Sequence, residues 1–378
     1  MESLSANEAA EYLGVSRRTL YAYVSRGLVV SEATAGRDRR YPRWSLDELK
    51  ARRADRREPA EGALRWGTPV LESALTLIDS ERLFYRGRDA VELSRAMSFE
   101  EVACLLWTGV TDGATDLFPS TSRAGGRGRI GDRLVARLVE ERARHPVSPA
   151  EPTRPTLRAA GAIVGALFEA AGATGRGTLA ARLSRGWRAV HAADDVRAAL
   201  VLCADHELNA SAFTARVVAA TDAPLPNALL AALFALEGRR HGGASREVST
   251  FLDEVDRVGA RRACERALAD RGRAPGFSGH SLYPHGDPRA VELLRRLDLA
   301  AREPAAKAIA FMTARGGEPT IELALAALAR RLRLGRDGAF GLFALGRSAG
   351  WVAHALEAAA SGRLIRPRAR YAGPAPGR

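Results

Sequence analysis

Apolar residues recur at helical spacing through most of this 378-residue chain, and two of these helical patterns meet at a glycine-flanked histidine. One pattern spans Ala228 to Leu236, and the other begins at Val248. Strict alternation of apolar and polar residues, which would predict strands, is scarce apart from a hairpin-like stretch over residues 75–88. Hydrophobic residues make up 46% of the chain, which is enough for a large buried core. The chain is therefore predicted to be mostly α-helical.

The composition argues against a membrane protein and against a metal site. No run reaches the roughly 18 uncharged apolar residues that a membrane-spanning helix needs, and we expect no signal peptide. Cys104, Cys203 and Cys264 lie far apart, without the spacing of metal ligands, and predict reduced thiols in a cytoplasmic protein. The formal net charge of +13 comes almost wholly from arginine spread over the chain. Only local clusters of arginine therefore count as evidence for a nucleic-acid or anion site.

The first 50 residues predict a small winged helix-turn-helix domain. Ser5 and Glu8 form a capping box for a first helix, and Ser16 begins a second helix after a tight turn that contains Gly14. The candidate DNA-contacting residues lie at the start of the second helix and in a basic loop that would form the wing, and they are Arg17, Arg18, Thr19, Tyr21, Arg39 and Arg40. A module that contacts only proteins is the alternative. Residues 51–64 read as a charged linker.

His241 is the first candidate catalytic residue. It is followed by Gly242 and Gly243 at the corner between the two helical patterns. Glycines allow a ligand or a second backbone to come close, and the amide groups at the start of the next helix disfavour a positively charged ring. We therefore expect a neutral imidazole that donates a hydrogen bond, as a developing enolate oxygen requires. The alternative is a structural hydrogen bond at a helix junction.

Two further histidines lie in polar breaks of the helical pattern. His280 follows Gly276 and Gly279, and Arg289 comes after this break, near the start of a helix. His206 lies between two acidic residues, where it is either a donor to an anion or part of a surface helix start. Neutral histidines together with arginines suit a substrate that carries carboxylates and a carbonyl group.

The last 60 residues add a carboxylate and further arginines. Glu322 lies in the first turn of a helical pattern, as a catalytic base or as simple complementation of the helix dipole. Residues 340–357 predict an apolar helix interrupted at Gly346 and Gly350. Arg347 is its only charge before the last residue, and a buried arginine needs an anionic partner. The basic end, which contains Arg366, would lie across a neighbouring subunit.

Two parts of this chain each resemble a known family. Residues 1–50 resemble the MerR and excisionase-type helix-turn-helix domains, through A-x-x-L-G-V-S-x-x-T-L-x-x-Y-x-x-x-G-L and a basic R-x-Y wing. Residues 65–378 resemble citrate synthase in a series of motifs in chain order: E-x-x-L-T-x-I-D and Y-R-G within 72–87, S-F-E-E-V-A-x-L-L-W-x-G at 98–109, A-D-H-E-x-N-A-S at 204–211, H-G-G-A at 241–244, G-F-x-G-H-x-x-Y-x-x-x-D-P-R at 276–289, G-R-x-x-G-W-x-A-H at 346–354 and R-P-R-x-x-Y-x-G at 366–373.

The second resemblance implies a nearly all-helical homodimer with a large domain and a small one, the small one covering about 210–315 of residues 65–378. It implies the condensation of acetyl-CoA with oxaloacetate to citrate and CoA, with no metal and no other cofactor. By position in the motifs, the implied roles are enol stabilisation by His241, ketone polarisation by His280, proton abstraction by Glu322 and oxaloacetate binding by His206, Arg289, Arg347 and, from the partner subunit, the residue equivalent to Arg366.

Four departures from the family pattern cluster at this site. Glu322 stands where the family has Asp, which moves the carboxylate by about 1.5 Å and can cost about a hundredfold in rate. Arg239–Arg240 and Ser245–Arg246 replace other family residues around the H-G-G-A motif, and Ser278 is an extra residue before His280. We therefore expect reduced turnover or its loss. Two alternatives stay open: a 2-methylcitrate synthase that uses propionyl-CoA, and a DNA-binding regulator whose degenerate synthase domain senses ligands.

Overall fold

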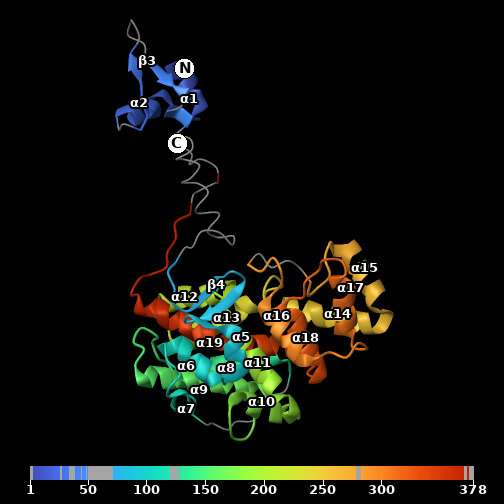
Figure 1. Cartoon of the computed structure of the whole chain (residues 1–378). Coiled ribbons are helices and arrows are strands. Elements are labelled where there is room, and N and C mark those ends of the chain that lie inside the picture. Colours follow the sequence, from blue (N-terminus) through green and yellow to red (C-terminus); the bar gives the residue numbers. More distant parts are fainter. Residues whose placement is uncertain are drawn as a thin grey trace. The chain divides into compact units, whose positions relative to one another are not determined.

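The structure is a computed structural model that describes residues 3–25, 28–33, 39–43, 45–47, 49, 71–119, 126, 128–277, 282–369 and 373. The chain forms two compact units, Met1–Glu72 and Ser73–Arg378. Helices predominate in both units, so the predicted mostly α-helical fold is confirmed (Figure 1).

The first unit has the elements of a winged helix-turn-helix. Its described elements are β1 (Ser3–Leu4), α1 (Ala6–Tyr12), α2 (Arg17–Ser25), β2 (Glu32–Ala33) and β3 (Arg39–Pro42). The strands form a sheet in the order β1-β3-β2, so β2 and β3 pair as the wing. The predicted capping box of Ser5 and Glu8 is present at the start of α1. A small core of its own, centred on Leu20 and Tyr41, holds these elements together.

The second unit opens with a small antiparallel sheet and continues as helices. The predicted hairpin is confirmed by β4 (Thr76–Asp79) and β5 (Arg82–Tyr85), to which β6 (Arg88–Asp89) pairs. The helices are α5 (Ala90–Ala96), α6 (Phe99–Thr108), α7 (Ala114–Leu117), α8 (Ile130–Arg144), α9 (Arg154–Ala171), α10 (Leu179–Gly186), the 3-10 turn η1 (Val190–Ala192), α11 (Ala193–Leu202), α12 (Ala210–Ala219), α13 (Leu225–Leu236), α14 (Ala244–Val258), α15 (Ala260–Arg271), α16 (Pro288–Leu297), α17 (Pro304–Thr313), α18 (Ile321–Arg331) and α19 (Gly338–Ala360).

The helices of the second unit pack in two groups. In the larger group, α6, α8, α9, α11, α12 and α13 surround α19. In the smaller group, α14, α15 and α17 pack on one another and lie together at one side in Figure 1. The sequence predicts a smaller subdomain over about 210–315; because α12 and α13 belong to the larger group, we propose that it begins near Ala244.

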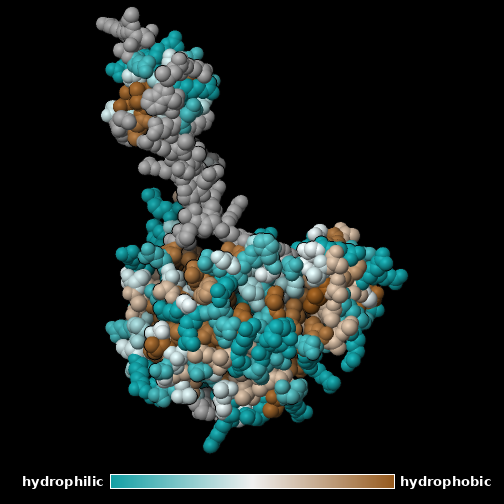
Figure 2. Space-filling model, viewed as in Figure 1, coloured by the Kyte–Doolittle hydropathy of each residue, from teal (hydrophilic) through white to brown (hydrophobic). Residues whose placement is uncertain are grey.

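The surface and the cysteines of the second unit fit a globular domain. Figure 2 shows hydrophilic residues over much of the visible face, with apolar patches between them. All three cysteines are buried and unpaired, as predicted. Within the described residues, no helix is long and apolar enough to cross a membrane.

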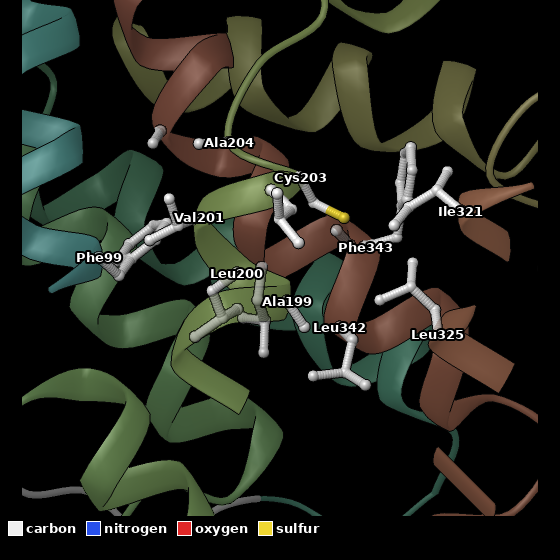
Figure 3. Packing of buried hydrophobic residues seen from close by; sticks show 14 of the residues in the cluster. Phe99, Ala199, Leu200, Val201, Cys203, Ala204, Ile321, Leu325, Leu342 and Phe343 are labelled. Carbon is white, nitrogen blue, oxygen red and sulfur yellow. The ribbon is translucent and has the colours of Figure 1, made fainter. Parts of the chain in front are cut away.

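The central helix α19 is continuous, which corrects the predicted interruption at Gly346 and Gly350. Both glycines serve close packing. A Cβ on Gly346 would lie 2.7 Å from Leu200 O, and one on Gly350 would lie 2.5 Å from Ala204 O. The amide of Gly350 donates to that same oxygen at 2.9 Å. Figure 3 shows Leu342 and Phe343 of this helix beside Leu200 and Cys203 of the contacted segment.

This contact leads to a prediction about stability. Replacing Gly350 with alanine should destabilise the second unit by about 1–3 kcal/mol, because the added methyl group overlaps the backbone of Ala204. Gly165 in α9 is the matched control, since nothing lies within 4 Å of its added Cβ. There the same change should stabilise by up to about 1 kcal/mol through helix propensity. Urea unfolding of both variants checks the prediction, and equal effects would contradict it.

Candidate active site

His241 lies at the corner between α13 and α14, where the chain folds back on the end of α13. A Cβ on Gly242 would lie 2.6 Å from Leu236 Cγ, and one on Gly243 would lie 2.7 Å from Gly238 O. The amide of Gly243 donates to Leu236 O at 3.0 Å. The two glycines therefore make room for the end of α13, which is the second of the two expectations from the sequence, a close approach of another stretch of backbone.

The ring of His241 is neutral at physiological pH. Its pKa is lowered to about 3, first by burial and then by the positive charge of Arg347. The edge of Phe343 meets the ring, with centroids 6.1 Å apart and an interplanar angle of 83°. The predicted neutral state is therefore found, but its causes are burial and a neighbouring arginine, and not the amides of α14.

Ser211, at the start of α12, holds the other side of this ring. Its Oγ lies 2.8 Å from His241 Nε2, accepts from Trp351 Nε1 at 3.0 Å, and donates to Asn209 Oδ1 at 2.8 Å. A serine hydroxyl has one proton for these two acceptors. When Ser211 donates to Nε2, the ring proton of His241 is on Nδ1, which no described residue contacts by a hydrogen bond.

Arg347 is buried in α19 next to this corner, with only 1% of its surface exposed. Its Nε donates to Cys203 O at 2.8 Å, whereas Nη2 is buried and has no hydrogen-bond partner among the described residues. Burial lowers the pKa of Arg347 and the Asp205 carboxylate offsets this only in part. Within the described part of the chain, no carboxylate forms an ion pair with it, so its predicted anionic partner is not found there.

Arg289 and His206 are connected through Tyr283. Arg289 is buried and bidentate to Asp287, with Nε to Oδ1 at 2.9 Å and Nη2 to Oδ2 at 2.8 Å. Burial alone would lower the pKa of Arg289, but Asp287 raises it. His206 Nε2 lies 2.9 Å from Tyr283 OH, and Arg289 lies 5.8 Å from the centre of the Tyr283 ring.

The charges of this region converge around Cys203. Burial raises the pKa of the Cys203 thiol to about 12, and Arg289, Arg347 and Glu322 all act on it electrostatically. In Figure 3, Cys203 lies beside Phe343 of α19 and Ile321 of α18. Three of the predicted site residues, from three different helices, thus lie near enough to Cys203 to affect its pKa, and Arg347 also donates to its backbone oxygen.

Glu322 is half-buried in the first turn of α18. No described residue forms a hydrogen bond or an ion pair with its carboxylate, which is therefore available to a ligand. The strand-like bridge between Phe277 and Pro319, with the amide of Thr320 donating to Gly276 O at 2.9 Å, ties this helix start to the segment that leads to His280. His280 itself lies outside the described residues, as does the extra residue Ser278.

The remaining predicted residues lie at the surface. Arg366 is exposed, and no hydrogen bond or ion pair joins it to another described residue. Arg239 pairs with Glu247 and Arg240 is exposed, so neither arginine places a charge in the core. Arg246 pairs with Asp337 at 2.7 Å. No described group of histidine, cysteine, aspartate and glutamate is arranged to hold a metal ion.

Five of the six candidate DNA-contacting residues of the first unit are exposed. Arg17, Arg18 and Tyr21 are exposed on α2, where Arg17 Nη2 donates to Tyr21 OH at 2.7 Å. Thr19 is half-buried, and its amide donates to Ser16 Oγ at 3.2 Å, so it helps to cap the helix. Arg39 and Arg40 are exposed on β3, in the wing; Arg39 Nη1 donates to Ser31 Oγ at 2.9 Å.

Comparison with known proteins assigns the family. A family model described as "Citrate synthase, C-terminal domain" matches residues 63–150 and 176–368, which together exceed half of the chain. The chain belongs to the citrate synthase family. A model described as "Helix-turn-helix domain" matches residues 3–54. Both resemblances found in the sequence are therefore confirmed.

Three similar proteins support this family assignment. "Citrate synthase 2" of Bacillus subtilis is 39% identical over 186 residues, which cover 47% of this chain and 50% of that protein, so the chain spans about half the length of this relative. "Citrate synthase" of Haloferax volcanii is 33% identical over 361 residues, which cover 81% of this chain and 94% of that protein. The solved citrate synthase of Thermotoga maritima shares the fold, with a TM-score of 0.66 at 24% identity over 82% of this chain and 96% of that one.

Several residues that position the site were missed by sequence reasoning. Ser211 and Trp351 hold His241 in place, and Tyr283 holds His206. Each lies inside a family motif, so the motif marked the stretch without giving the residue a role. The contacts join residues 30 to 140 positions apart, which no local pattern reveals.

The shifted pKa of His241 predicts a pH dependence of stability. The unfolded ring, with a pKa of 6.5, binds a proton that the folded ring, with a pKa of about 3, does not. The contribution of the neutral His241 ring to the free energy of unfolding is therefore fully present above pH 6.5. It decreases as the pH falls towards 3, by at most about 1.4 kcal/mol per pH unit. Urea unfolding at pH 7 and pH 5 should show a smaller loss for His241→Asn than for the wild type. Equal losses in the two proteins would show that the lowered pKa of His241 is not the cause of this pH dependence.

Proposed function

We propose that this chain is an acyltransferase that condenses acetyl-CoA with oxaloacetate and releases citrate and CoA. The observation that carries the proposal is the neutral ring of His241 beside the buried Arg347, whose Nη2 has no hydrogen-bond partner among the described residues. A neutral donor stabilises an enol, and an arginine with a vacant donor binds a carboxylate. Membership of the citrate synthase family supports the same reaction.

In the first step of the proposed reaction, Glu322 takes a proton from the methyl carbon of acetyl-CoA. The electron pair of that C–H bond forms the C=C bond and the carbonyl π pair moves to oxygen, which gives an enolate whose oxygen accepts a hydrogen bond from Nδ1–H of His241. For this step Ser211 would donate its proton to Nε2, at 2.8 Å, in place of Asn209 Oδ1, and so keep the ring proton on Nδ1. A carboxylate with no described protein partner and a neutral imidazole suit these two roles.

In the second step, the enolate carbon attacks the ketone carbon of oxaloacetate and forms the new C–C bond, while the thioester C=O bond is restored. The ketone oxygen takes up a proton, for which His280 is the proposed donor. Water then cleaves the thioester of the resulting citryl-CoA, so that citrate and CoA leave. The overall reaction consumes one water molecule and needs no other cofactor.

Oxaloacetate would be bound by residues at the Cys203 end of the site. Arg347 and Arg289 act electrostatically on Cys203, and His206 is fixed by Tyr283. Arg347 Nη2 is the clearest donor for a carboxylate, because two of the nitrogens of Arg289 are already bidentate to Asp287. We infer that Arg366 completes the site of the partner subunit in a homodimer. The exposed Val139 of α8 and Phe234 of α13, each with 53% of its surface accessible, support an interface on these adjoining helices.

The test is an assay of thiol release by the purified full-length chain with oxaloacetate and either acetyl-CoA or propionyl-CoA. Release with acetyl-CoA that depends on oxaloacetate supports the proposal. A higher kcat/KM for propionyl-CoA would make the chain a 2-methylcitrate synthase instead. A pocket discriminates between two acyl groups that differ by one methylene by only about 1–3 kcal/mol, so both donors are compared on the same preparation. No release above background with either donor overturns the proposal.

A second candidate function rests on the first unit. We propose that it binds duplex DNA, with the N-terminal end of α2 in the major groove and the β2–β3 wing on the backbone. The exposed arginines at positions 17, 18, 39 and 40 support this, since cations of this kind contact phosphates and base edges. In this reading the synthase domain either works independently or senses its ligand and changes the DNA affinity.

Fluorescence anisotropy of the full-length chain with labelled genomic DNA fragments tests this second proposal. Replacing Arg18 and Arg39 with alanine should weaken binding at least tenfold. It should also reduce the slope of log affinity against log salt concentration by the amount expected for about two fewer phosphate contacts. Replacing the exposed Arg261 and Arg302 in the other unit removes the same charge and should have little effect. Equal effects of the two pairs would show that binding is nonspecific. Added oxaloacetate that changes the affinity would favour the ligand-sensing regulator.

A further inference from the structure

A buried set of polar side chains joins α19 to the segment between α11 and α12. His354 of α19 and Asp205 of that segment are both fully buried. His354 Nε2 lies 3.2 Å from Asp205 Oδ1 and 3.3 Å from Asp205 Oδ2. On the other side of the ring, His354 Nδ1 lies 3.1 Å from Nη1 of Arg216, which belongs to α12. The proposed reaction gives none of these three side chains a role.

The contact with Arg216 determines where the proton of His354 lies. A guanidinium group has donors but no acceptor, so Arg216 Nη1 donates to His354 Nδ1. Nδ1 therefore carries no proton, and the ring is the neutral tautomer with its proton on Nε2. That proton is donated to Asp205 Oδ2. The charge of Arg216 is balanced by Glu357, to which the same Nη1 also donates.

Asp205 is therefore a buried carboxylate whose hydrogen-bond donors are neutral. It accepts from His354 Nε2 at 3.3 Å and from Thr76 Oγ1 of β4. No described lysine or arginine forms an ion pair with Asp205. A buried charge is costly unless another charge compensates it, so the compensation of Asp205 comes from a cation that does not touch it.

Arg347 is a buried cation close to this carboxylate. Gly350 follows Arg347 by about one turn on the same face of α19, and a Cβ on Gly350 would lie 2.4 Å from Asp205 Oδ1. Arg347 Nε donates to the backbone oxygen of Cys203, two residues before Asp205, at 2.8 Å. Burial lowers the pKa of Arg347, and Asp205 acts against this. The two groups do not touch, but charges interact strongly in a weakly polar interior.

We propose that Asp205 is the internal counter-charge of Arg347 and sets the affinity of the site for a carboxylate ligand. In the ligand-free chain, the carboxylate stabilises the buried guanidinium. When a second carboxylate binds to Arg347 Nη2, it is repelled by Asp205, and part of the binding free energy is lost. The affinity for oxaloacetate is thus lower than Arg347 alone would give, which also favours release of the tricarboxylate product. The identity of the ligand rests on the proposed function, whereas the pairing of the two charges does not.

Urea unfolding tests the pairing without any ligand. Asp205→Asn keeps an oxygen that accepts from His354 and Thr76 but removes the charge. This variant should lower the urea midpoint of the second unit, and so should Arg347→Gln, because each leaves one buried charge without its compensation. The double variant should lose less than the sum of the two single losses. Additive losses would overturn the proposal. If Asp205→Asn alone does not fold, a folded double variant is the expected rescue, and an unfolded one overturns the pairing.

Nitrogen-15 NMR of the histidine rings tests the neutral state of His354. The ring signals of His354 are assigned by their absence from His354→Gln. They should show a protonated Nε2 and an unprotonated Nδ1. Two protonated nitrogens would make the ring a cation that compensates Asp205 by itself, and would overturn the proposal.

Isothermal titration calorimetry of the full-length chain with oxaloacetate tests the effect on affinity. Asp205→Asn should bind oxaloacetate at least about fivefold more tightly than the wild type, because the repulsion is removed. A merely structural role of Asp205 predicts weaker binding, and that result would overturn the proposal. Asp195→Asn, at a half-buried acid near the start of α11, is the matched control and should leave the affinity unchanged.

Equal tightening in Asp205→Asn and Asp195→Asn would reflect net charge alone and would also overturn the proposal. A wild-type chain and an Asp205→Asn variant that both fail to bind oxaloacetate would contradict the proposed function instead. In that case the unfolding data and the ring signals still decide whether Asp205 and Arg347 compensate each other.

Discussion

Replacing Glu322 with glutamine is expected to lower the rate of condensation by about 10²–10⁴-fold, the usual contribution of a general base. Glutamine keeps the size of the side chain but cannot take the methyl proton. No described residue forms a hydrogen bond or an ion pair with the Glu322 carboxylate, so the change should not reduce stability. Steady-state assays with acetyl-CoA, together with a urea unfolding curve, separate lost chemistry from lost fold.

The matched control is Glu318→Gln, which makes the same change at a half-buried acid just before α18. It should leave kcat within about twofold, because a surface substitution away from the chemistry has little effect. Glu322→Asp should raise turnover, since the family has Asp at this position and the shorter side chain withdraws the carboxylate by about 1.5 Å. Turnover of Glu322→Asp at or below the wild-type level would mean that the site is built around glutamate.

Replacing His241 with alanine is expected to lower kcat by about 10²–10³-fold, as the loss of one donor to a developing oxyanion does. The neutral ring is the only described side chain at this corner with a free N–H when Ser211 donates to Nε2. KM for oxaloacetate should change little, because Arg347 and Arg289 keep their contacts to Cys203 and Asp287. Measuring kcat and KM separately for both substrates checks this.

Two further variants make the His241 result specific. His191→Ala removes an exposed imidazole on η1 and should leave kcat unchanged. Ser211→Ala removes the hydroxyl that positions His241 but leaves the ring, so its loss of kcat should be smaller than that of His241→Ala. A Ser211→Ala variant as inactive as His241→Ala would instead mean that the hydroxyl itself contacts substrate.

Local chemistry predicted much of this fold. Ser5 and Ser98 cap their helices as the capping-box spacing indicates, and the hairpin at Thr76–Tyr85 follows from its alternating pattern. These features depend on residues a few positions apart. The motifs around His206 and His241 likewise marked stretches that the structure connects through Ser211 and Trp351.

Features set by tertiary packing could not be predicted in this way. Glycine in a helix costs about 1 kcal/mol, which favoured a break at Gly346 and Gly350. The close contact with Leu200 and Ala204 outweighs that cost, and it depends on residues about 145 positions away. The neutral state of His241 was predicted, but its causes, burial and Arg347, belong to the assembled core. The boundary near Ala244 also follows from packing alone.

The corner at His241 also lies where the two groups of helices meet. Ser211 and Phe343 attach the imidazole to the larger group, while α14 departs three residues later as the first helix of the smaller group. If α14, α15 and α17 moved as a group, the hinge would therefore include His241 itself. Substrates could then enter and leave while the ring nitrogen that we propose binds the enolate oxygen kept its position.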